Sequence, residues 1–295
     1  MYRGIAFEGG GVTGISHIGV LEVLEDQKIY SQLTHFAGSS AGAIIAALAA
    51  CRTSLKQMKE VMLKLKFAQF EDSSWSTLYD VYRFVREYGW NSNGDIEKTV
   101  IDVLKEITGD GTITMDGVLK RYGSTLIITT TNVETAKTEY LSPVTHPTMT
   151  VAHAITLTSC LPVIYPPVNE NGTLYTDGGL TNNYPIRALY HYLPPEHVIG
   201  VKLVSDEDVN RDSGKPHNVI SYYRRIIEIM HNQNLKAHVH KEDWNRTIKV
   251  SVGQISVADF KLTDLQKTFL VDQGRIAAIK WFTETSHVAD REFGC

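Results

Sequence analysis

The chain is poor in the residues that mark disulfide-rich, nucleic-acid-binding and membrane-spanning proteins. Its three cysteines in 295 residues, Cys51, Cys160 and Cys295, are odd in number and widely spaced, which indicates neither a disulfide framework nor a zinc site. The net charge of -4 at pH 7 argues against nucleic acid as a partner and against strong electrostatic attachment to anionic membranes. The longest uncharged apolar run, residues 41–51, is too short to cross a bilayer.

The residues that are present suit a globular α/β protein. Apolar residues make up 43% of the chain and charged residues 21%, which allows a substantial core. Segments of helical and strand character alternate along the chain, so we expect one α/β domain over residues 1–295. A buried strand is predicted at residues 4–7, directly after Met1-Tyr2-Arg3. We therefore expect no signal peptide and a cytoplasmic location.

A glycine-rich loop follows this first strand. The loop is Glu8-Gly9-Gly10-Gly11-Val12-Thr13-Gly14, and a helix is predicted after it because apolar residues recur there at helical spacing. These apolar residues are Ile15, Ile18, Leu21 and Leu24. Free N–H groups and the positive end of the helix dipole would converge at the glycines, where the backbone can come close to an anion. That anion could be a phosphate or a developing oxyanion, and a glycine-rich turn that binds no ligand is the structural alternative.

A second motif contains the candidate nucleophile. Gly38-Ser39-Ser40-Ala41-Gly42 lies between a short apolar strand predicted at residues 34–37 and an apolar helix predicted at residues 43–51. A serine on so tight a turn projects its hydroxyl clear of the backbone, and the glycines allow strained dihedrals and close packing. If the two strands are adjacent and parallel, this turn and the glycine-rich loop meet at one edge of the sheet. The loop would then form an oxyanion hole beside Ser40.

A third motif supplies a carboxylate. A short strand predicted at residues 173–176, after the hairpin turn Asn171-Gly172, ends in Asp177-Gly178-Gly179. Alone, this sequence is typical of an ordinary turn. Together with the first two motifs, it is better explained as part of a functional site than as an ordinary turn.

The motifs also allow a nucleotide site. Gly9, Gly11 and Gly14 satisfy the pattern G-x-G-x-x-G after a first strand. A nucleotide fold expects an acidic residue at the end of the second strand to hold a ribose, whereas this strand ends in Gly38. The pattern therefore favours the oxyanion hole over the nucleotide.

A conventional triad is a further alternative. Asp177 is followed along the chain by His191, His197 and His231, in the order of an α/β-hydrolase. That fold normally builds several strands before its nucleophile, however, and here the candidate is residue 40. His17 lies just past the glycine-rich loop, and we expect it to pack in the core.

With the three motifs in this order and at this spacing, the chain resembles the patatin-like phospholipase family. A fourth stretch, Ser159-Cys160-Leu161-Pro162, is similar to the family's Ser-x-x-Pro segment. The resemblance covers residues 3–205 well and the C-terminal extension, residues 206–295, loosely. It implies a three-layer α/β fold with a central, mostly parallel sheet flanked by helices.

The resemblance implies a lipid acyl hydrolase of the phospholipase A or lysophospholipase type. Such an enzyme cleaves carboxylic esters through a Ser-Asp dyad and an acyl-enzyme intermediate, without a cofactor or metal. Carried over by position, Ser40 would be the nucleophile, Asp177 the base, and the N–H groups of Gly10 and Gly11 the oxyanion hole. The other motif glycines are Gly9, Gly14, Gly38, Gly42, Gly178 and Gly179. A neutral-lipid esterase, an acyltransferase or an inactive lipid-binding protein on the same fold are the alternatives.

One residue departs from the family pattern. Many members carry Arg or Lys where this chain has Thr13, and a cation there would help to hold a phosphate head group or an oxyanion. The departure puts the head-group preference in question while leaving the fold assignment unchanged.

The expected partner is a lipid ester in a membrane or lipid aggregate, contacted peripherally. Because the net charge is low, contact must come from apolar or aromatic surface. The densest such segment, residues 67–90, is a candidate lid or interfacial surface, although core packing is the favoured interpretation because aromatic stripes usually face a core. The need for an activating protein partner stays open.

The remaining elements complete the expected fold. Helices are predicted at residues 95–107, 115–121, 151–158, 220–240 and 263–282, and strands at 124–132 and 198–204. The last helix opens on Thr263-Asp264-Leu265-Gln266, a capping box. Residues 205–218 are predicted to be a mobile loop, and the acidic cluster Asp206-Glu207-Asp208 in it is expected to be solvated charge instead of a calcium site.

Overall fold

The computed structural model describes residues 1–64, 93–162, 164–205, 222, 225–226, 229, 238–257, 259 and 262–293. The candidate lid segment, residues 67–90, lies outside the described residues. So do the acidic cluster at residues 206–208, most of the loop expected at 205–218 and most of the helix expected at 220–240.

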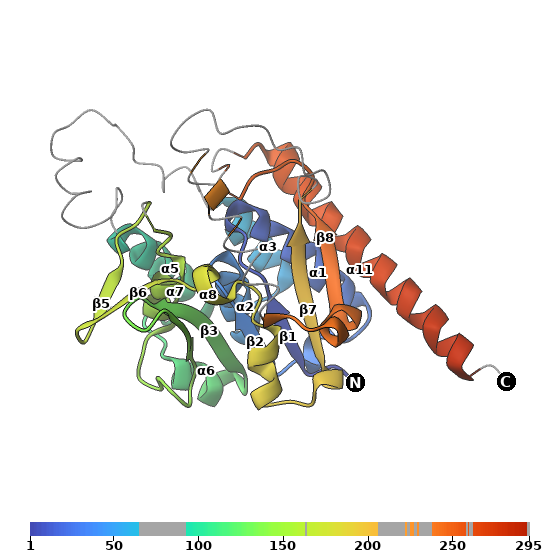
Figure 1. Ribbon diagram of the computed structural model, residues 1–295, viewed down its shortest axis with the longest axis horizontal. Helices are drawn as coiled ribbons and strands as arrows, with labels where there is room; N and C mark the ends of the chain where they lie inside the picture. The colour runs from blue at the N-terminus through green and yellow to red at the C-terminus, as the bar shows by residue number, and fades with distance from the viewer. Residues whose placement is uncertain are drawn as a thin grey trace.

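A mixed, mostly parallel sheet forms the centre of the described molecule (Figure 1). Its strand order is β5-β6-β3-β2-β1-β7-β8, and β4 pairs with β3. The strands β3, β2, β1, β7 and β8, which are neighbours in this order, are parallel to one another. By contrast, β4, β5 and β6 run antiparallel to the strands they pair with. The strands are β1 (Gly4–Phe7), β2 (His35–Gly38), β3 (Thr125–Asn132), β4 (Lys137–Leu141), β5 (Val168–Glu170), β6 (Thr173–Asp177), β7 (Val198–Val204) and β8 (Thr247–Ser251).

Helices cover this sheet on both faces, which confirms the expected α/β architecture. The α-helices are α1 (Ser16–Asp26), α2 (Ala41–Ala50), α3 (Leu55–Lys64), α5 (Asn93–Thr108), α6 (Met115–Tyr122), α7 (Val151–Ser159), α8 (Gly179–Asn182) and α11 (Asp264–Phe293). Short 3-10 helices are η1 (Gly11–Ile15), η2 (Tyr30–Gln32), η4 (Ile186–His191), η5 (Pro195–His197) and η6 (Lys241–Arg246). None of the helices in the described ranges has both the length and the apolarity needed to span a bilayer.

The two faces of the sheet differ in the size of their side chains. Successive residues of a strand point to opposite faces, so Ile5 and Phe7 enter the large core, which also contains apolar residues of α1, α2, α7 and α11. Ala6 and Ala37 face the other side, where a smaller core forms against Ile186 and other residues of η4. Small residues on this face allow the thin layer of η4 to lie close to β1 and β2.

The helix α11 closes one edge of the molecule. In Figure 1 it runs beside β8 and α1, with its C-terminal end projecting past them. Gly19 of α1 and Gly274 of α11 lie against the partner backbone, where a Cβ would meet Val271 O and Ser16 O. The expected capping box is present, because the N–H of Gln266 donates to Thr263 Oγ1 (3.3 Å) and that of Thr263 to Gln266 Oε1 (2.9 Å).

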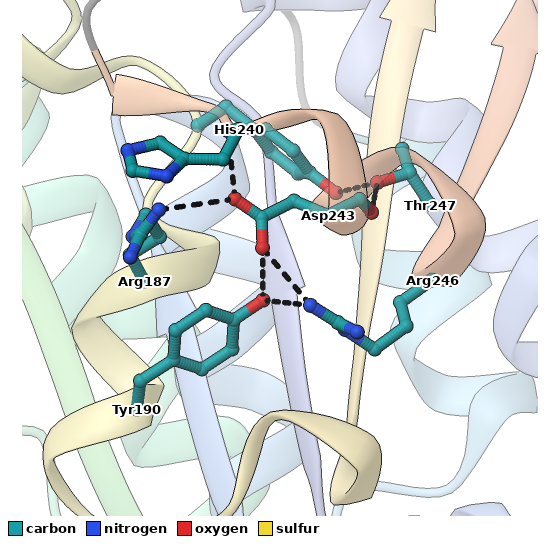
Figure 2. Close-up of polar contacts among 7 residues, drawn as sticks. Arg187, Tyr190, His240, Asp243, Arg246 and Thr247 are labelled. Carbon is teal, nitrogen blue, oxygen red and sulfur yellow. Dashed lines mark hydrogen bonds and ion pairs between the residues drawn. The ribbon is translucent and has the colours of Figure 1, made fainter.

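A buried polar network fixes η6, in the C-terminal extension, to η4. Asp243 lies at its centre (Figure 2) and accepts hydrogen bonds from the Tyr190 hydroxyl (2.6 Å), the His240 N–H (2.9 Å) and the Arg246 guanidinium (3.1 Å). Arg187 makes an ion pair at 3.7 Å with Oδ2, the oxygen that accepts the His240 N–H, whereas Tyr190 and Arg246 contact Oδ1. Since the Asp243 side chain is 2% exposed, these partners replace the water that it loses on folding.

The structure corrects several expected boundaries. The glycine-rich loop leads first into η1 and only then into α1, and α11 extends to Phe293 instead of ending at residue 282. β4, β5 and β8 were not predicted from the sequence. β4 and β5 lack a clear alternation of apolar and polar residues, and the alternation in β8 covers only five residues.

Candidate active site

Ser40 lies on a strained turn between β2 and α2. Its φ of 49° and ψ of -124° fall outside the regions that residues with a Cβ normally adopt. The turn packs so closely that a Cβ on Gly38 would collide with the carbonyl of Gly42. A Cβ on Gly42 would lie 2.5 Å from the carbonyl oxygen of Phe7, at the end of β1. Both glycines are therefore required for the turn that presents the Ser40 hydroxyl.

The glycine-rich loop lies beside this serine, as the sequence predicts. β1 and β2 are adjacent and parallel, with Phe7 opposite Gly38, so both turns leave the same edge of the sheet. A Cβ on Gly9 would lie 3.2 Å from the Ser40 Cβ, and one on Gly14 would lie 3.0 Å from the Ala41 Cβ.

Two peptide groups of this loop are held through hydrogen bonds to their carbonyl oxygens. The carbonyl of Gly9 accepts a hydrogen bond from Asn183 Nδ2 (2.9 Å), and the carbonyl of Gly10 accepts one from the Thr13 hydroxyl (2.7 Å). In a trans peptide the N–H points away from the preceding carbonyl, and the described residues contain no cis peptide. Asn183 and Thr13 thus set the directions of the Gly10 and Gly11 N–H groups.

These two N–H groups are free in the described part of the chain, unlike their neighbours. The N–H of Gly9 donates to Asn183 O (3.0 Å) and that of Val12 to Val257 O (3.1 Å), whereas no described residue accepts from Gly10 or Gly11. Gly11 has a φ of +52°, and a Cβ there would collide with the Val257 carbonyl. The geometry therefore leaves two donors available to an anion beside Ser40.

The base of the loop is anchored through Glu8. Its carboxylate accepts from Lys202 Nζ (2.8 Å) and from the Leu203 N–H (2.7 Å), which ties the loop to β7. Its carbonyl contacts His17 Nε2 at 2.9 Å. Burial lowers the pKa of His17 to about 4, against the opposing effect of this hydrogen bond. The ring is therefore neutral at pH 7 and donates from Nε2. It also packs edge-on against Phe7, with ring centroids 5.2 Å apart.

Asp177 ends β6 and faces Ser40 from the other side. It is 2% exposed, and its Oδ1 accepts the N–H of Gly179 at 2.7 Å. Its Oδ2 has no hydrogen-bond partner within the usual distance among the described residues. The Ser40 hydroxyl is close enough to act on the carboxyl as a hydrogen-bond donor. The two groups are therefore neighbours, although no hydrogen bond joins the Ser40 hydroxyl to Asp177 Oδ2.

The protonation behaviour of Asp177 follows from its burial. Burial raises the pKa of the carboxyl to about 6, and the hydrogen bonds from Gly179 and Ser40 oppose this rise. The carboxyl is therefore ionised at pH 7 but more basic than an exposed aspartate. Gly178 allows the aspartate turn to pack against β3, since a Cβ there would collide with the carbonyl of Thr129.

The histidines of the alternative triad lie elsewhere. His197 precedes β7, and its carbonyl accepts from Arg3 at the start of β1, at the sheet edge opposite to Ser40. The neighbour of His191, Tyr192, packs its ring at a tilt against His35 at the start of β2, with centroids 5.8 Å apart. The third candidate, residue 231, lies outside the described residues. The described ranges hold no cluster of three or more potential metal ligands.

Two residues at this site had no prediction from the sequence. Asn183 and Thr158 contact the glycine-rich loop and the Ser40 backbone through hydrogen bonds between distant segments. Thr158 is fully buried in α7, as is Thr156, so the sequence of this helix does not indicate which threonine contacts Ser40. For Asn183, its position six residues after Asp177 gave no indication of its partner.

This fold and site define an α/β protein with a serine on a strand-to-helix turn opposite a buried aspartate. A family model described as patatin-like phospholipase matches residues 5–190. The chain belongs to the patatin-like phospholipase family, which replaces the nucleotide-binding alternative.

Individual relatives agree with this assignment. The uncharacterized protein YqhO of Bacillus subtilis is 28% identical over 289 residues, covering 93% of this chain and 96% of that protein. Lysophospholipase NTE1 of Cryptococcus neoformans is 30% identical over 188 residues, which are 63% of this chain and 10% of that protein. The crystal structure of VipD from Legionella pneumophila is similar in fold, with a TM-score of 0.65 at 16% identity over 96% of this chain and 67% of that one.

Proposed function

We propose that the chain is a lipid acyl hydrolase that cleaves carboxylic esters through an acyl-enzyme intermediate. The observation that carries the proposal is the proximity of Ser40, on its strained turn, to the buried carboxylate of Asp177, whose Oδ2 has no hydrogen-bond partner among the described residues. The free N–H groups of Gly10 and Gly11 support it, because they lie on a loop packed against Ser40.

The first half-reaction acylates the serine. Asp177 accepts the proton of the Ser40 hydroxyl as Oγ attacks the ester carbonyl carbon. The carbonyl oxygen becomes an oxyanion and receives hydrogen bonds from the Gly10 and Gly11 N–H groups. When the tetrahedral intermediate collapses, the ester C–O bond breaks, Asp177 returns its proton to the leaving alcohol, and the acyl group stays on Oγ.

The second half-reaction repeats these steps with water. Asp177 accepts a proton from a water molecule that attacks the acyl carbon, and the same two N–H groups stabilise the second oxyanion. Collapse breaks the bond to Oγ, which regains its proton from Asp177. The fatty acid leaves and the free serine is restored.

The donors and the helix dipole supply much of the acceleration, because a carboxylate is a weak base for a hydroxyl. Losing one oxyanion donor typically costs about 2.7 to 4 kcal/mol of transition-state stabilisation. α2 begins directly after Ser40 and directs the positive end of its dipole toward the reacting atoms. The glycines therefore matter as much as the dyad.

Family membership and the name of the NTE1 relative favour a phospholipid or lysophospholipid substrate. Thr13 is fully buried and its hydroxyl is engaged with the Gly10 carbonyl, so this position carries no cation for a phosphate group. We expect the protein to act peripherally on membranes or lipid aggregates in the cytoplasm. A neutral-lipid esterase, an acyltransferase and an inactive lipid-binding protein are the alternatives that the test must separate.

The test is release of fatty acid from mixed-chain phospholipids, lysophospholipids and neutral glycerides by the wild type, Ser40→Ala and Ser39→Ala. Ser39 is the matched control, because it is a neighbouring serine whose buried hydroxyl has no hydrogen-bond partner among the described residues. We expect Ser40→Ala to lose release and Ser39→Ala to keep it, with lysophospholipids and phospholipids above glycerides.

Each alternative predicts a different result. Preferred release from glycerides would support the neutral-lipid esterase, and transfer of the acyl group to an added alcohol in place of water would support the acyltransferase. No release by folded wild type, together with no labelling of Ser40 by a fluorophosphonate probe, would contradict the hydrolase and favour a lipid-binding protein.

A further inference from the structure

The backbone of Ser40 is held by a side chain far away in the sequence. Its N–H donates to the Thr158 hydroxyl oxygen at 2.9 Å, across 118 residues. Thr158 is fully buried near the C-terminal end of α7. The strained turn between β2 and α2 is therefore held by a hydrogen bond to a third element, α7.

The same end of α7 also holds the aspartate segment. The carbonyl of Thr158 accepts the N–H of Gly178 (3.4 Å), and the carbonyl of Cys160 accepts the N–H of Asp177 (3.0 Å). The Thr176 hydroxyl donates to this Cys160 carbonyl as well, at 2.6 Å. Ser40 and Asp177 come from distant parts of the chain, and the C-terminal end of α7 is hydrogen-bonded to the backbone of both.

We propose that Thr158 is a positioning residue, whose hydroxyl oxygen holds the Ser40 turn at the correct distance from Asp177. The inference rests on the proposed hydrolase function. Thr158 acts through the Ser40 backbone and does not itself contact the reacting atoms.

The physical reason lies in the strained turn. A residue with a positive φ keeps this conformation only when its surroundings impose it. Among the described residues, Thr158 Oγ1 is the hydrogen-bond acceptor for the Ser40 N–H. Without this acceptor, a part-buried N–H is left unpaired, and the turn can relax toward an ordinary conformation. The hydroxyl of Ser40 would then move relative to Asp177.

A movement of the Ser40 hydroxyl away from Asp177 would change the pH dependence of the rate, which a general loss of stability would not do. The Ser40 hydroxyl lowers the pKa of the Asp177 carboxyl, so loss of that contact raises this pKa and shifts the acid limb of the pH–rate profile upward. The adjacent titratable group is the Cys160 thiol, whose pKa burial raises, so it stays neutral in this range. His153, earlier on α7, is engaged with Glu170 (2.9 Å) and Glu97 (3.4 Å).

The same helix provides a matched control. Thr156 is 1% exposed, and its hydroxyl donates within α7 to the carbonyl of Ala152 at 2.9 Å. Valine replaces threonine with nearly the same shape and removes the hydroxyl. Thr156→Val and Thr158→Val thus make the same chemical change on one buried helix, and only the second removes the acceptor of the Ser40 N–H.

The experiment measures kcat and KM for a soluble p-nitrophenyl ester between pH 5 and 9, using the full chain. For Thr158→Val we expect kcat to fall about 10- to 100-fold, as small misplacements of catalytic groups do, with KM within about twofold and the acid limb shifted to higher pH. Thr156→Val is expected to match the wild type. Thr158→Ser keeps the oxygen and should recover most of kcat.

If Thr158→Val does not fold, Thr158→Ala and Thr158→Ser form the second comparison, because they differ by one oxygen atom. We expect the serine variant to be at least tenfold faster. Equal kcat in these two, or equal kcat in Thr158→Val and Thr156→Val, would overturn the inference while an active wild type upholds the hydrolase. A wild type with neither turnover nor fluorophosphonate labelling of Ser40 would overturn both.

Discussion

Asn183 forms hydrogen bonds with both polar backbone atoms of Gly9. The N–H of Gly9 donates to the Asn183 carbonyl at 3.0 Å, and Asn183 Nδ2 donates to the Gly9 carbonyl at 2.9 Å. Asn183 follows the Asp177 segment, so one residue joins the candidate base to the glycine-rich loop. The second of these bonds also orients the Gly10 N–H, through the plane of the shared peptide.

Replacing Asn183 by aspartate should therefore impair the oxyanion hole. Asn183→Asp removes the donor and places a carboxylate beside a carbonyl, so we expect kcat to fall about 100-fold. The control is Asn182→Asp, because the Asn182 amide donates to the Tyr140 hydroxyl instead (3.1 Å). Hydrolysis of a soluble ester by both variants tests this, and equal losses would contradict the orienting role of Asn183.

The pH dependence of activity should follow the ionisation of Asp177. Because burial raises the pKa of this carboxyl to about 6, the rate of ester hydrolysis should fall about tenfold per pH unit below pH 6 and level off above it. His17 stays neutral over this range, since burial lowers its pKa to about 4. A plateau that extends down to pH 5 on a neutral ester would contradict Asp177 as the base.

The same carboxyl should reduce the stability of the fold at neutral and higher pH. The folded-state pKa of about 6 lies above the unfolded value of 3.8, so the wild type loses stability as pH rises through about 6. Asp177→Asn lacks this loss. We compare the free energies of unfolding of Asp177→Asn and of the wild type. At 1.36 kcal/mol per pKa unit, the difference in favour of the variant should be about 2 kcal/mol larger at pH 8 than at pH 4.5. Urea unfolding at both pH values measures the difference, and a pH-independent difference would contradict it.

Gly42 should tolerate no side chain. In Gly42→Ala the Cβ would lie 2.5 Å from the carbonyl oxygen of Phe7 and 2.6 Å from that of Glu8, which we expect to cost about 3 kcal/mol or more and to abolish labelling of Ser40. Gly123→Ala is the control, because its Cβ would meet nothing within 4 Å and costs only the strain of a φ of 63°, about 1 kcal/mol. Urea unfolding measures both variants, and a similar loss of unfolding free energy in Gly42→Ala and Gly123→Ala would contradict the close packing proposed for Gly42.

Asp243 should matter for stability and little for chemistry. Asp243→Ala removes the acceptor of the Tyr190 hydroxyl and the buried carboxylate that pairs with the Arg246 guanidinium (Figure 2), which we expect to cost about 3 to 5 kcal/mol. Asp116→Ala breaks the exposed pair with Lys120 (2.6 Å) and should cost less than about 1 kcal/mol. Urea unfolding compares them. Loss of kcat in folded Asp243→Ala would show that the network reaches the active site.

The parallel core of the fold was predictable because its strands are buried and its turns carry marked residues. The apolar segment that forms β7 was found at residues 198–204, as observed. The hairpin Asn171-Gly172 was found as well, and both residues have a positive φ. β8 escaped prediction because its alternating segment, in which Ile248 and Val250 are buried, is only five residues long.

The sequence by itself determined the family and the positions of Ser40, Asp177 and the glycines, because tight turns at strand ends restrict which residues can occupy them. The tertiary structure decided how these groups are held. Thr158 and Asn183 reach partners 118 and 174 residues away, and such contacts leave no periodic trace in the chain. The pKa of Asp177 was likewise decided by burial, which arises only when β6, α7 and the Ser40 turn pack together.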